Sequence, residues 1–182
     1  MDQTPSVFTP DFTLETRVAV ICASWHAHIV GQASQSLLAE LARQGLPSTQ
    51  VDVLHVPGAF EIPLLAQRLA QYGRHSAIVA CGLVVDGGIY RHDFVASAVI
   101  DGLMRVQLDT GVPVFSCVLT PQAFHEHDEH QAFFARHFVT KGQEVARALV
   151  QTLAATHQAQ AMLAGLAAPA TGRASAALSA AA

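Results

Sequence analysis

Four short apolar runs alternate along this chain with segments that carry a helical apolar pattern. The runs are rich in β-branched residues and cover residues 17–23, 50–56, 77–85 and 112–119. The helical patterns lie at 28–44, 61–72, 93–109 and 125–138, with a restart near 141 that continues to about 156. Near-continuous apolar strands separated by helices indicate a parallel sheet that is covered on both faces.

Four such strands predict an α/β fold, namely a flavodoxin-like three-layer α/β/α domain with a four-stranded parallel sheet. In that architecture ligands bind outside the carboxyl ends of the strands, where the strand order reverses. The segments that follow the strands are therefore the first places to search for chemistry.

Composition divides the chain into three parts. Residues 1–15 contain two prolines and mixed polarity, and we expect them to form an N-terminal arm. Residues 16–160 form the expected domain. Residues 161–182 are dominated by alanine, glycine and serine. This last segment has no apolar stripe with which to dock, so it is predicted to be a disordered tail.

The chain has few charges for its apolar content. Hydrophobic residues make up 51% and charged residues 13%, whereas about 25% charged is usual. The helix expected at 93–109 is apolar on more than one stripe, which a helix buried inside the monomer or a subunit interface would explain. We favour the interface, and with it a homo-oligomer. The net charge of −4 does not indicate the excess of basic residues that is typical of nucleic-acid-binding proteins.

The three cysteines, Cys22, Cys81 and Cys117, all lie within apolar runs. Free buried thiols in a reducing compartment are the simplest interpretation. No uninterrupted apolar run reaches the roughly 18–20 residues that span a bilayer, and the first residues do not have the pattern of a signal peptide. We therefore expect a cytoplasmic protein with no membrane partner.

The first two strand ends offer groups for a planar, polar ligand. Trp25 follows the first strand and is either a core residue or a platform for a ring. After the second strand, Gly58 permits a close backbone approach. Ala59 and Phe60 then bring N–H groups at a helix start, where donors lack intrahelical partners. Glu61 either complements the helix dipole or accepts hydrogen bonds from a polyol.

The third strand end carries two consecutive glycines, Gly87 and Gly88, before a helix start. Such a turn favours an anion such as a phosphate, because peptide N–H groups and the helix dipole both point at it. Arg91 and His92 add a fixed cation and a group that titrates near neutral pH. Asp93 is expected to cap the following helix.

The fourth strand is followed by His125, His127 and His130 among three carboxylates. A metal site is one interpretation, but the spacing does not match a known ligand pattern, and we expect no metal. Surface solvation, or imidazolium groups that contact a phosphate, are the preferred uses of these histidines.

Four of these strand-end segments, ASWH, PGAFEIP, GLVVDGGIYRHDFV and VLTPQAFHE, resemble the 6,7-dimethyl-8-ribityllumazine synthase family of riboflavin biosynthesis. The resemblance covers roughly residues 17–156, and GGIYRHDFV is similar to the second branch of the family. It implies a transferase that condenses 5-amino-6-(D-ribitylamino)uracil with 3,4-dihydroxy-2-butanone 4-phosphate and releases phosphate and water. It implies no cofactor, and it implies assembly as a pentamer or a decamer of two pentamers.

The resemblance also implies roles for individual residues. Trp25 is expected to stack on the pyrimidine ring, and Gly58, Ala59, Phe60 and Glu61 to hold the ribityl chain. Backbone groups at the ring edge are implied for Leu83, Val84 and Val85. Phosphate contacts are implied for Gly88, Ile89 and His130, and a contact from the adjacent subunit for Ser116. Our own hypothesis adds Gly87, because the Gly87-Gly88 turn favours an anion.

The chain departs from the common family pattern at two positions and in the segment 131–139, which is rearranged relative to that pattern. Arg91 and His92 stand where the common branch has one histidine, so both are candidates for the proton-transfer role. Ser116 replaces an aromatic residue. Two alternatives to catalysis share the same fold: a flavin- or lumazine-binding protein, and a structural shell protein.

Overall fold

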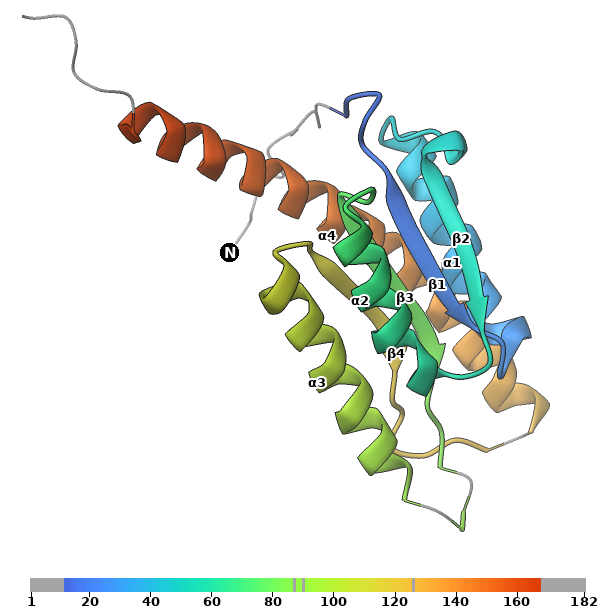
Figure 1. Ribbon diagram of the computed structural model, residues 1–182. Helices are drawn as coiled ribbons and strands as arrows, with labels where there is room; N and C mark the ends of the chain where they lie inside the picture. The colour runs from blue at the N-terminus through green and yellow to red at the C-terminus, as the bar shows by residue number, and fades with distance from the viewer. Residues whose placement is uncertain (1–11, 87, 90, 126, 168–182) are drawn as a thin grey trace, which may run out of the picture.

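A computed structural model describes residues 12–86, 88–89, 91–125 and 127–167 (Figure 1). The strands are β1 (Val18–Ala23), β2 (Val51–Val56), β3 (Ala77–Leu83) and β4 (Val114–Leu119). The helices are α1 (Ala27–Arg43), α2 (Ile62–Tyr72), α3 (His92–Thr110) and α4 (Asp128–Ala167), with short 3₁₀ turns at Ser48–Gln50 and Ala59–Glu61. The four strands and the first three helices predicted from the apolar pattern are present, within a few residues of their expected ends, whereas the last helix differs from its prediction.

The four strands form one parallel sheet in the order β2-β1-β3-β4. Helices α1 and α4 cover one face of the sheet, and α2 and α3 cover the other (Figure 1). The chain moves outward from β1 to β2 and then crosses back to β3, so the strand order reverses between β1 and β3. The predicted three-layer α/β/α architecture is confirmed, and its switch point lies at the carboxyl ends of these two central strands.

Alternation along the central strands builds two hydrophobic cores. In β1, Val18, Val20 and Cys22 face α1 and α4, whereas Ala19 and Ile21 face α2 and α3. Cys22 and Cys117 flank Cys81 in register on the two neighbouring strands, and all three thiols are free and buried, as predicted. Contact with the Cys117 thiol, contact with Cys22 and burial raise the pKa of Cys81 well above its ordinary value.

Helix α4 is continuous, so the break predicted between residues 138 and 141 is wrong. The β-branched pair Val139 and Thr140 and the glycine at 142 disfavour helix locally. Packing against α1 overrides this preference, because Ser36 donates a hydrogen bond to the carbonyl oxygen of Val139 at 2.9 Å. Gly142 lies against Ser36 and the carbonyl group of Ala33, where a Cβ atom has no room.

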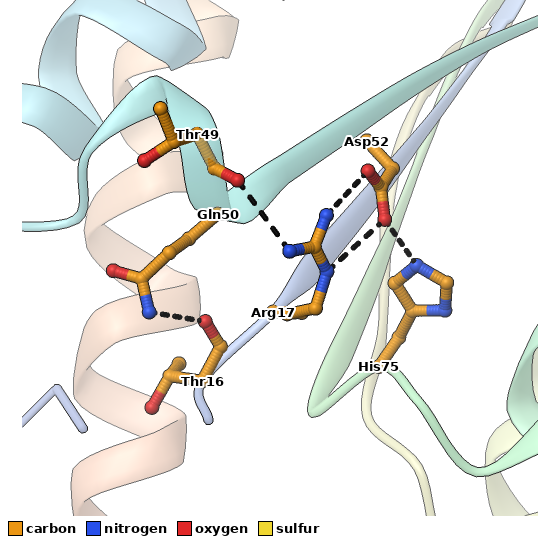
Figure 2. A network of polar contacts seen from close by, with 6 residues as sticks. All are labelled: Thr16, Arg17, Thr49, Gln50, Asp52 and His75. Carbon is orange, nitrogen blue, oxygen red and sulfur yellow. Dashed lines mark hydrogen bonds and ion pairs between the residues drawn. The ribbon is translucent and has the colours of Figure 1, made fainter. Parts of the chain in front are cut away.

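The amino ends of three strands are joined by one polar network (Figure 2). Asp52 of β2 accepts hydrogen bonds from the Arg17 guanidinium, the shorter at 2.6 Å, and its Oδ2 lies 2.9 Å from Nε2 of His75. Arg17, and then His75, hold the pKa of Asp52 below its ordinary value. This network joins the strands at the amino edge of the sheet. The loops that carry the candidate site lie at the opposite, carboxyl edge.

Helix α3 keeps much of its apolar surface outside the monomer. Val99, Leu103 and Val106 are buried against the sheet. A second set is solvent-exposed in the single chain: Phe94, Val95, Ile100, Met104 and Leu108. One face of a sheet therefore does not accommodate all the apolar residues of this helix, as the sequence pattern indicates.

Helix α4 continues to Ala167, so the first residues of the segment expected to be a disordered tail are helical. Residues 168–182, and residues 1–11 of the expected arm, lie outside the described residues. Within the described ranges, no helix combines the length and the apolar character that crossing a membrane requires.

Candidate functional site at the carboxyl edge of the sheet

The loops after β1 and β2 are held together by backbone hydrogen bonds. The Ser24 N–H donates to the carbonyl oxygens of Val56 at 2.8 Å and Pro57 at 3.2 Å, and the Trp25 N–H donates to Pro57 at 3.1 Å. His26 then adopts a left-handed conformation with φ of 53°, after which α1 begins. These contacts bring the ASWH and PGAFEIP segments side by side at the switch point.

Trp25 lies over the backbone of Gly58. A Cβ atom at Gly58 would be 3.0 Å from two atoms of the indole ring and 3.2 Å from Oε2 of Glu61, so a side chain there would require these groups to move. The indole is 67% exposed, which excludes the core alternative for this residue. An exposed, flat apolar ring that follows a strand at the carboxyl edge of the sheet is suited to stacking on a planar ligand.

Glu61 has a structural partner. Its Oε2 accepts a hydrogen bond from the Gly58 N–H at 2.9 Å, which closes a capping interaction at the start of α2. Ala59 is buried and Phe60 is exposed in the same turn. The carboxylate of Glu61 thus orients the turn, and its remaining lone pairs can accept hydrogen bonds from hydroxyl groups.

The end of β3 supplies buried backbone to the same edge. Leu83 and Val84 are buried and Val85 is half-buried. The Val84 N–H donates to the Leu119 carbonyl oxygen at 2.9 Å, so it is already used within the sheet. Gly82 lies against Ala59, where a Cβ atom would be 3.3 Å from the Ala59 side chain, and this close approach joins β3 to the turn that contains Phe60 and Glu61.

The loop after β3 turns sharply at Gly88. Gly88 has φ of 75°, which favours glycine, and its N–H donates to Oδ1 of Asp86 at 2.8 Å. Ile89, the next residue, is exposed. Gly87, one of the predicted anion-binding residues, lies outside the described residues.

Arg91 and His92 point to different partners. Arg91 has a side chain that is 69% exposed; its Nη2 donates to Oδ2 of Asp93 at 2.9 Å, and its guanidinium lies 4.1 Å from the centre of the Phe94 ring. Hydrogen bonding to Arg91 lowers the pKa of Asp93. Asp93 pairs with Arg91 and is the second residue of α3, whereas the N-cap position belongs to Arg91, whose side chain makes no capping hydrogen bond. The prediction that Asp93 is the capping residue of this helix is therefore wrong.

His92 is the first residue of α3, and its side chain is 24% exposed. Its Nδ1 lies 3.9 Å from Oδ1 of Asp86, the carboxylate that also accepts from Gly88. The two candidates for proton transfer thus differ in surroundings: Arg91 is held in an ion pair at the surface, and His92 lies at the loop.

His130 belongs to an aromatic cluster at the start of α4. Its Nδ1 accepts a hydrogen bond from the His125 N–H at 2.9 Å, so the neutral ring carries its proton on Nε2. Its ring stacks on Phe124 with centroids 5.8 Å apart. A hollow of about 470 Å³ opens here, lined by His125, His127, Glu129, His130 and Phe133.

His125 and His127 precede α4, which begins at Asp128. The helix start expected at residue 125 is therefore wrong, since both histidines lie before the helix. Among the described residues, no group of three or more His, Cys, Asp or Glu side chains is arranged to hold a metal ion.

Two strand-end loops meet through a residue that the sequence pattern did not single out. The His26 ring lies 5.3 Å from Phe124, edge to face, so the loop after β1 contacts the loop after β4. His28 of α1 also bonds to Gln131 of α4 at 2.8 Å. No spacing rule connects these residues, which are about a hundred positions apart in the chain.

Ser116 lies apart from the loops, in the middle of β4, where it pairs in register with Ala80. It is exposed in the single chain, although its neighbour Cys117 is buried. The position is compatible with a contact to another subunit.

A family model for 6,7-dimethyl-8-ribityllumazine synthase matches residues 15–157. The chain belongs to this family. The match covers all four strands and the helices α1, α2 and α3, together with the part of α4 that precedes its last turns. All the loops of the candidate site therefore lie within the lumazine synthase match.

Three relatives show how closely the chain follows the lumazine synthases. A 6,7-dimethyl-8-ribityllumazine synthase of Rhodococcus erythropolis is 63% identical over 137 residues, which are 75% of this chain and 88% of the relative. A 6,7-dimethyl-8-ribityllumazine synthase 2 of Bradyrhizobium diazoefficiens is 56% identical over 149 residues, 82% and 89% of the two chains. A further synthase 2, of Pseudomonas syringae, is 55% identical over 137 residues, 75% and 81% of the two chains.

Proposed function

We propose that this protein is a transferase of riboflavin biosynthesis. It condenses 5-amino-6-(D-ribitylamino)uracil with 3,4-dihydroxy-2-butanone 4-phosphate to 6,7-dimethyl-8-ribityllumazine, phosphate and water. Family membership and the names of its similar relatives support this reaction. Two of those relatives carry the name synthase 2, which supports a place in the second branch of the family.

One observation carries the proposal: an exposed ring platform, a helix-start turn and a half-buried histidine all follow strands that end at one edge of the sheet. Trp25 follows β1 and His92 follows β3, the two strands that flank the switch point. The turn at Glu61 is tied to Trp25 through Gly58. These are the groups that a planar pyrimidine with a polyol chain and an acid–base step require.

The roles that we propose for the remaining residues are those that the family resemblance implies, with Gly87 added by our own hypothesis. Trp25 stacks on the pyrimidine, and Gly58, Ala59, Phe60 and Glu61 hold the ribityl hydroxyl groups. Leu83, Val84 and Val85 line the ring edge, Val84 by groups other than its N–H. The residues that contact the phosphate are Gly87, Gly88, Ile89 and His130.

Between the two candidates for proton transfer, His92 has the better surroundings. The guanidinium of Arg91 stays charged and is paired with Asp93, so it does not exchange protons near neutral pH. His92 is half-buried, and its Nδ1 lies 3.9 Å from Oδ1 of Asp86, which accepts the Gly88 N–H. We assign the proton transfer to His92 and an electrostatic contribution to Arg91, with His130 donating from Nε2 to the phosphate.

The exposed apolar surface of α3 supports a homo-oligomer. Phe94, Met104 and Leu108 are each more than half exposed in the single chain, and several large exposed apolar side chains on one helix are typical of an interface. We propose a pentamer or a decamer of two pentamers, in which Ser116 contacts the site of an adjacent subunit. Sedimentation of the purified protein tests this: a monomer at micromolar concentration would contradict it.

The reducing environment suited to three free buried thiols supports a cytoplasmic location. Substrates are small molecules, and the net charge of −4 argues against a nucleic acid partner.

The experiment is an assay of lumazine formation from the two substrates, with and without added inorganic phosphate. We expect product to form well above the rate without protein, and phosphate to inhibit by competing with the butanone phosphate. Tight riboflavin binding without product formation would instead assign the chain to a non-catalytic binding protein of the same fold.

A further inference from the structure

Asp86 and His92 face each other across the turn that follows β3. Oδ1 of Asp86 lies 3.9 Å from Nδ1 of His92 and accepts the Gly88 N–H at 2.8 Å. The loop and the first turn of α3 bring three charged side chains, Asp86, Arg91 and Asp93. Two of them, Arg91 and Asp93, pair with each other, so Asp86 is the carboxylate that faces His92.

The position of His92 at a helix start explains why a nearby carboxylate matters for its protonated form. His92 is the first residue of α3, where the helix dipole disfavours an imidazolium ion. Asp86 supplies negative charge at the ring nitrogen that points back to the loop. Catalytic hydrogen bonds are commonly long in ligand-free structures and shorten in the substrate complex, so the present separation is compatible with a functional pair.

We propose that Asp86 is a positioning residue that orients His92 and stabilises its protonated form during the condensation. The inference rests on the proposed function and deepens it. When the Asp86 carboxylate accepts a hydrogen bond from Nδ1–H of His92, the lone pair of Nε2 is directed away from the loop and toward the substrate. The aspartate of a Ser-His-Asp triad orients its histidine in the same way. The Asp86 carboxylate therefore contacts both the Gly88 N–H of the turn and the ring of His92, the proton-transfer group.

In the first step, the addition of the amine to the ketone, every proton that leaves one group is accepted by another of these groups. The amine nitrogen of the pyrimidine forms a bond to the ketone carbon, and the carbonyl π electrons move to the oxygen. The amine proton passes to Nε2 of His92, and the resulting imidazolium returns it to that oxygen, which becomes a hydroxyl group. Asp86 remains ionised throughout and opposes the positive charge of the ring.

The test separates the charge of Asp86 from its structural bond to Gly88. Asp86→Asn keeps a side-chain oxygen that accepts the Gly88 N–H, since asparagine is as suited to this turn as aspartate, but it removes the charge. We expect kcat to fall at least 10-fold with KM nearly unchanged. The limb of the pH–rate profile that is lost in His92→Ala should move to lower pH, because the imidazolium has lost its counter-charge.

Asp109→Asn is the control, since it removes an exposed carboxylate near the other end of α3 that pairs with Arg105, outside the candidate site. We expect its kcat to stay within about twofold of wild type, on the ordinary scale of surface charge changes. The double variant Asp86→Asn with His92→Ala should be no slower than His92→Ala alone, because the two residues act as one unit.

Three results would overturn the inference. A wild-type kcat and pH profile in Asp86→Asn would assign Asp86 to the Gly88 turn only. A further loss of rate when Asp86→Asn is added to His92→Ala would show that Asp86 acts through another group. A His92→Ala variant as active as wild type would refute the role of His92 itself, and a wild-type protein that forms no lumazine would refute the proposed function.

Discussion

The ion-pair cluster between α1 and α4 gives a quantitative prediction of stability. Glu40 is 6% exposed, and its carboxylate accepts hydrogen bonds from the side chains of Arg43, Gln44 and Arg147. The Arg43 guanidinium, at 2.6 Å, is the main cause that lowers the pKa of Glu40 from its ordinary value of 4.5 to about 2. Replacing Glu40 by glutamine removes the charge and keeps the shape.

The lowered pKa sets the size and the pH range of the effect. Each unit of pKa shift corresponds to about 1.4 kcal/mol, so the lowered pKa of Glu40 contributes at most about 3 kcal/mol to the free energy of unfolding. Solvent screening of the exposed Arg43 guanidinium reduces this to roughly 1–2 kcal/mol. Because the folded-state pKa of Glu40 is the lower one, the contribution is complete above pH 4.5 and is lost as the pH falls through about 2.

The assay is urea unfolding of wild type and Glu40→Gln at pH 7 and at pH 2.5, with the protein concentration held fixed because oligomers unfold in a concentration-dependent way. We expect the variant to be about 1–2 kcal/mol less stable at pH 7 and the difference to shrink strongly at pH 2.5. The control is Glu144→Gln, which breaks the exposed 2.7 Å pair with Lys141 and should change the free energy of unfolding by less than about 0.5 kcal/mol. Equal losses for Glu40→Gln at both pH values would refute the electrostatic account and leave packing as the cause.

Three further substitutions test packing, the ring platform and the amino-edge network. Gly142→Ala places a methyl group against Ser36 and the backbone of α1 and should destabilise by about 2 kcal/mol or more in thermal unfolding, whereas the same change at the exposed Gly165 should be neutral or stabilising. Gly58→Ala should displace the indole of the single tryptophan, seen as altered fluorescence and a raised KM for the pyrimidine substrate; unchanged fluorescence would contradict the contact. Asp52→Asn removes the charge at the centre of the network in Figure 2, and it should lower the free energy of unfolding by about 1 kcal/mol at pH 7 while leaving kcat unchanged. A loss of kcat at unchanged stability would contradict a purely structural role of the network.

The arrangement of elements was predictable because local and tertiary preferences agree over most of the chain. Gly73 and Gly111 take positive φ just after α2 and α3, where the apolar patterns end. The strands at the centre of the sheet are buried throughout, so their continuous apolar runs identify them.

Prediction was wrong where tertiary contacts outweigh propensity. Val139 and Gly142 indicate a break in the last helix, and the close approach of α1 at that point keeps the helix continuous. No local pattern gives the distance between two helices, so this outcome required the structure.

The sequence indicated which loops carry the candidate site but not how their side chains pair. Consecutive Arg91 and His92 were equivalent candidates in the sequence, and they differ in the structure because Asp93 engages the first and Asp86 faces the second. The contact between Trp25 and Gly58, and the bond that fixes the tautomer of His130, likewise depend on the meeting of loops and not on spacing.

The most direct test of the proposed function is the rate of lumazine formation by the purified wild-type protein, measured with both substrates against a blank without protein. We predict 6,7-dimethyl-8-ribityllumazine and phosphate in equal amounts, at a rate proportional to protein concentration and far above the blank. A rate equal to the blank, in a sample that is folded and binds riboflavin, would contradict the account.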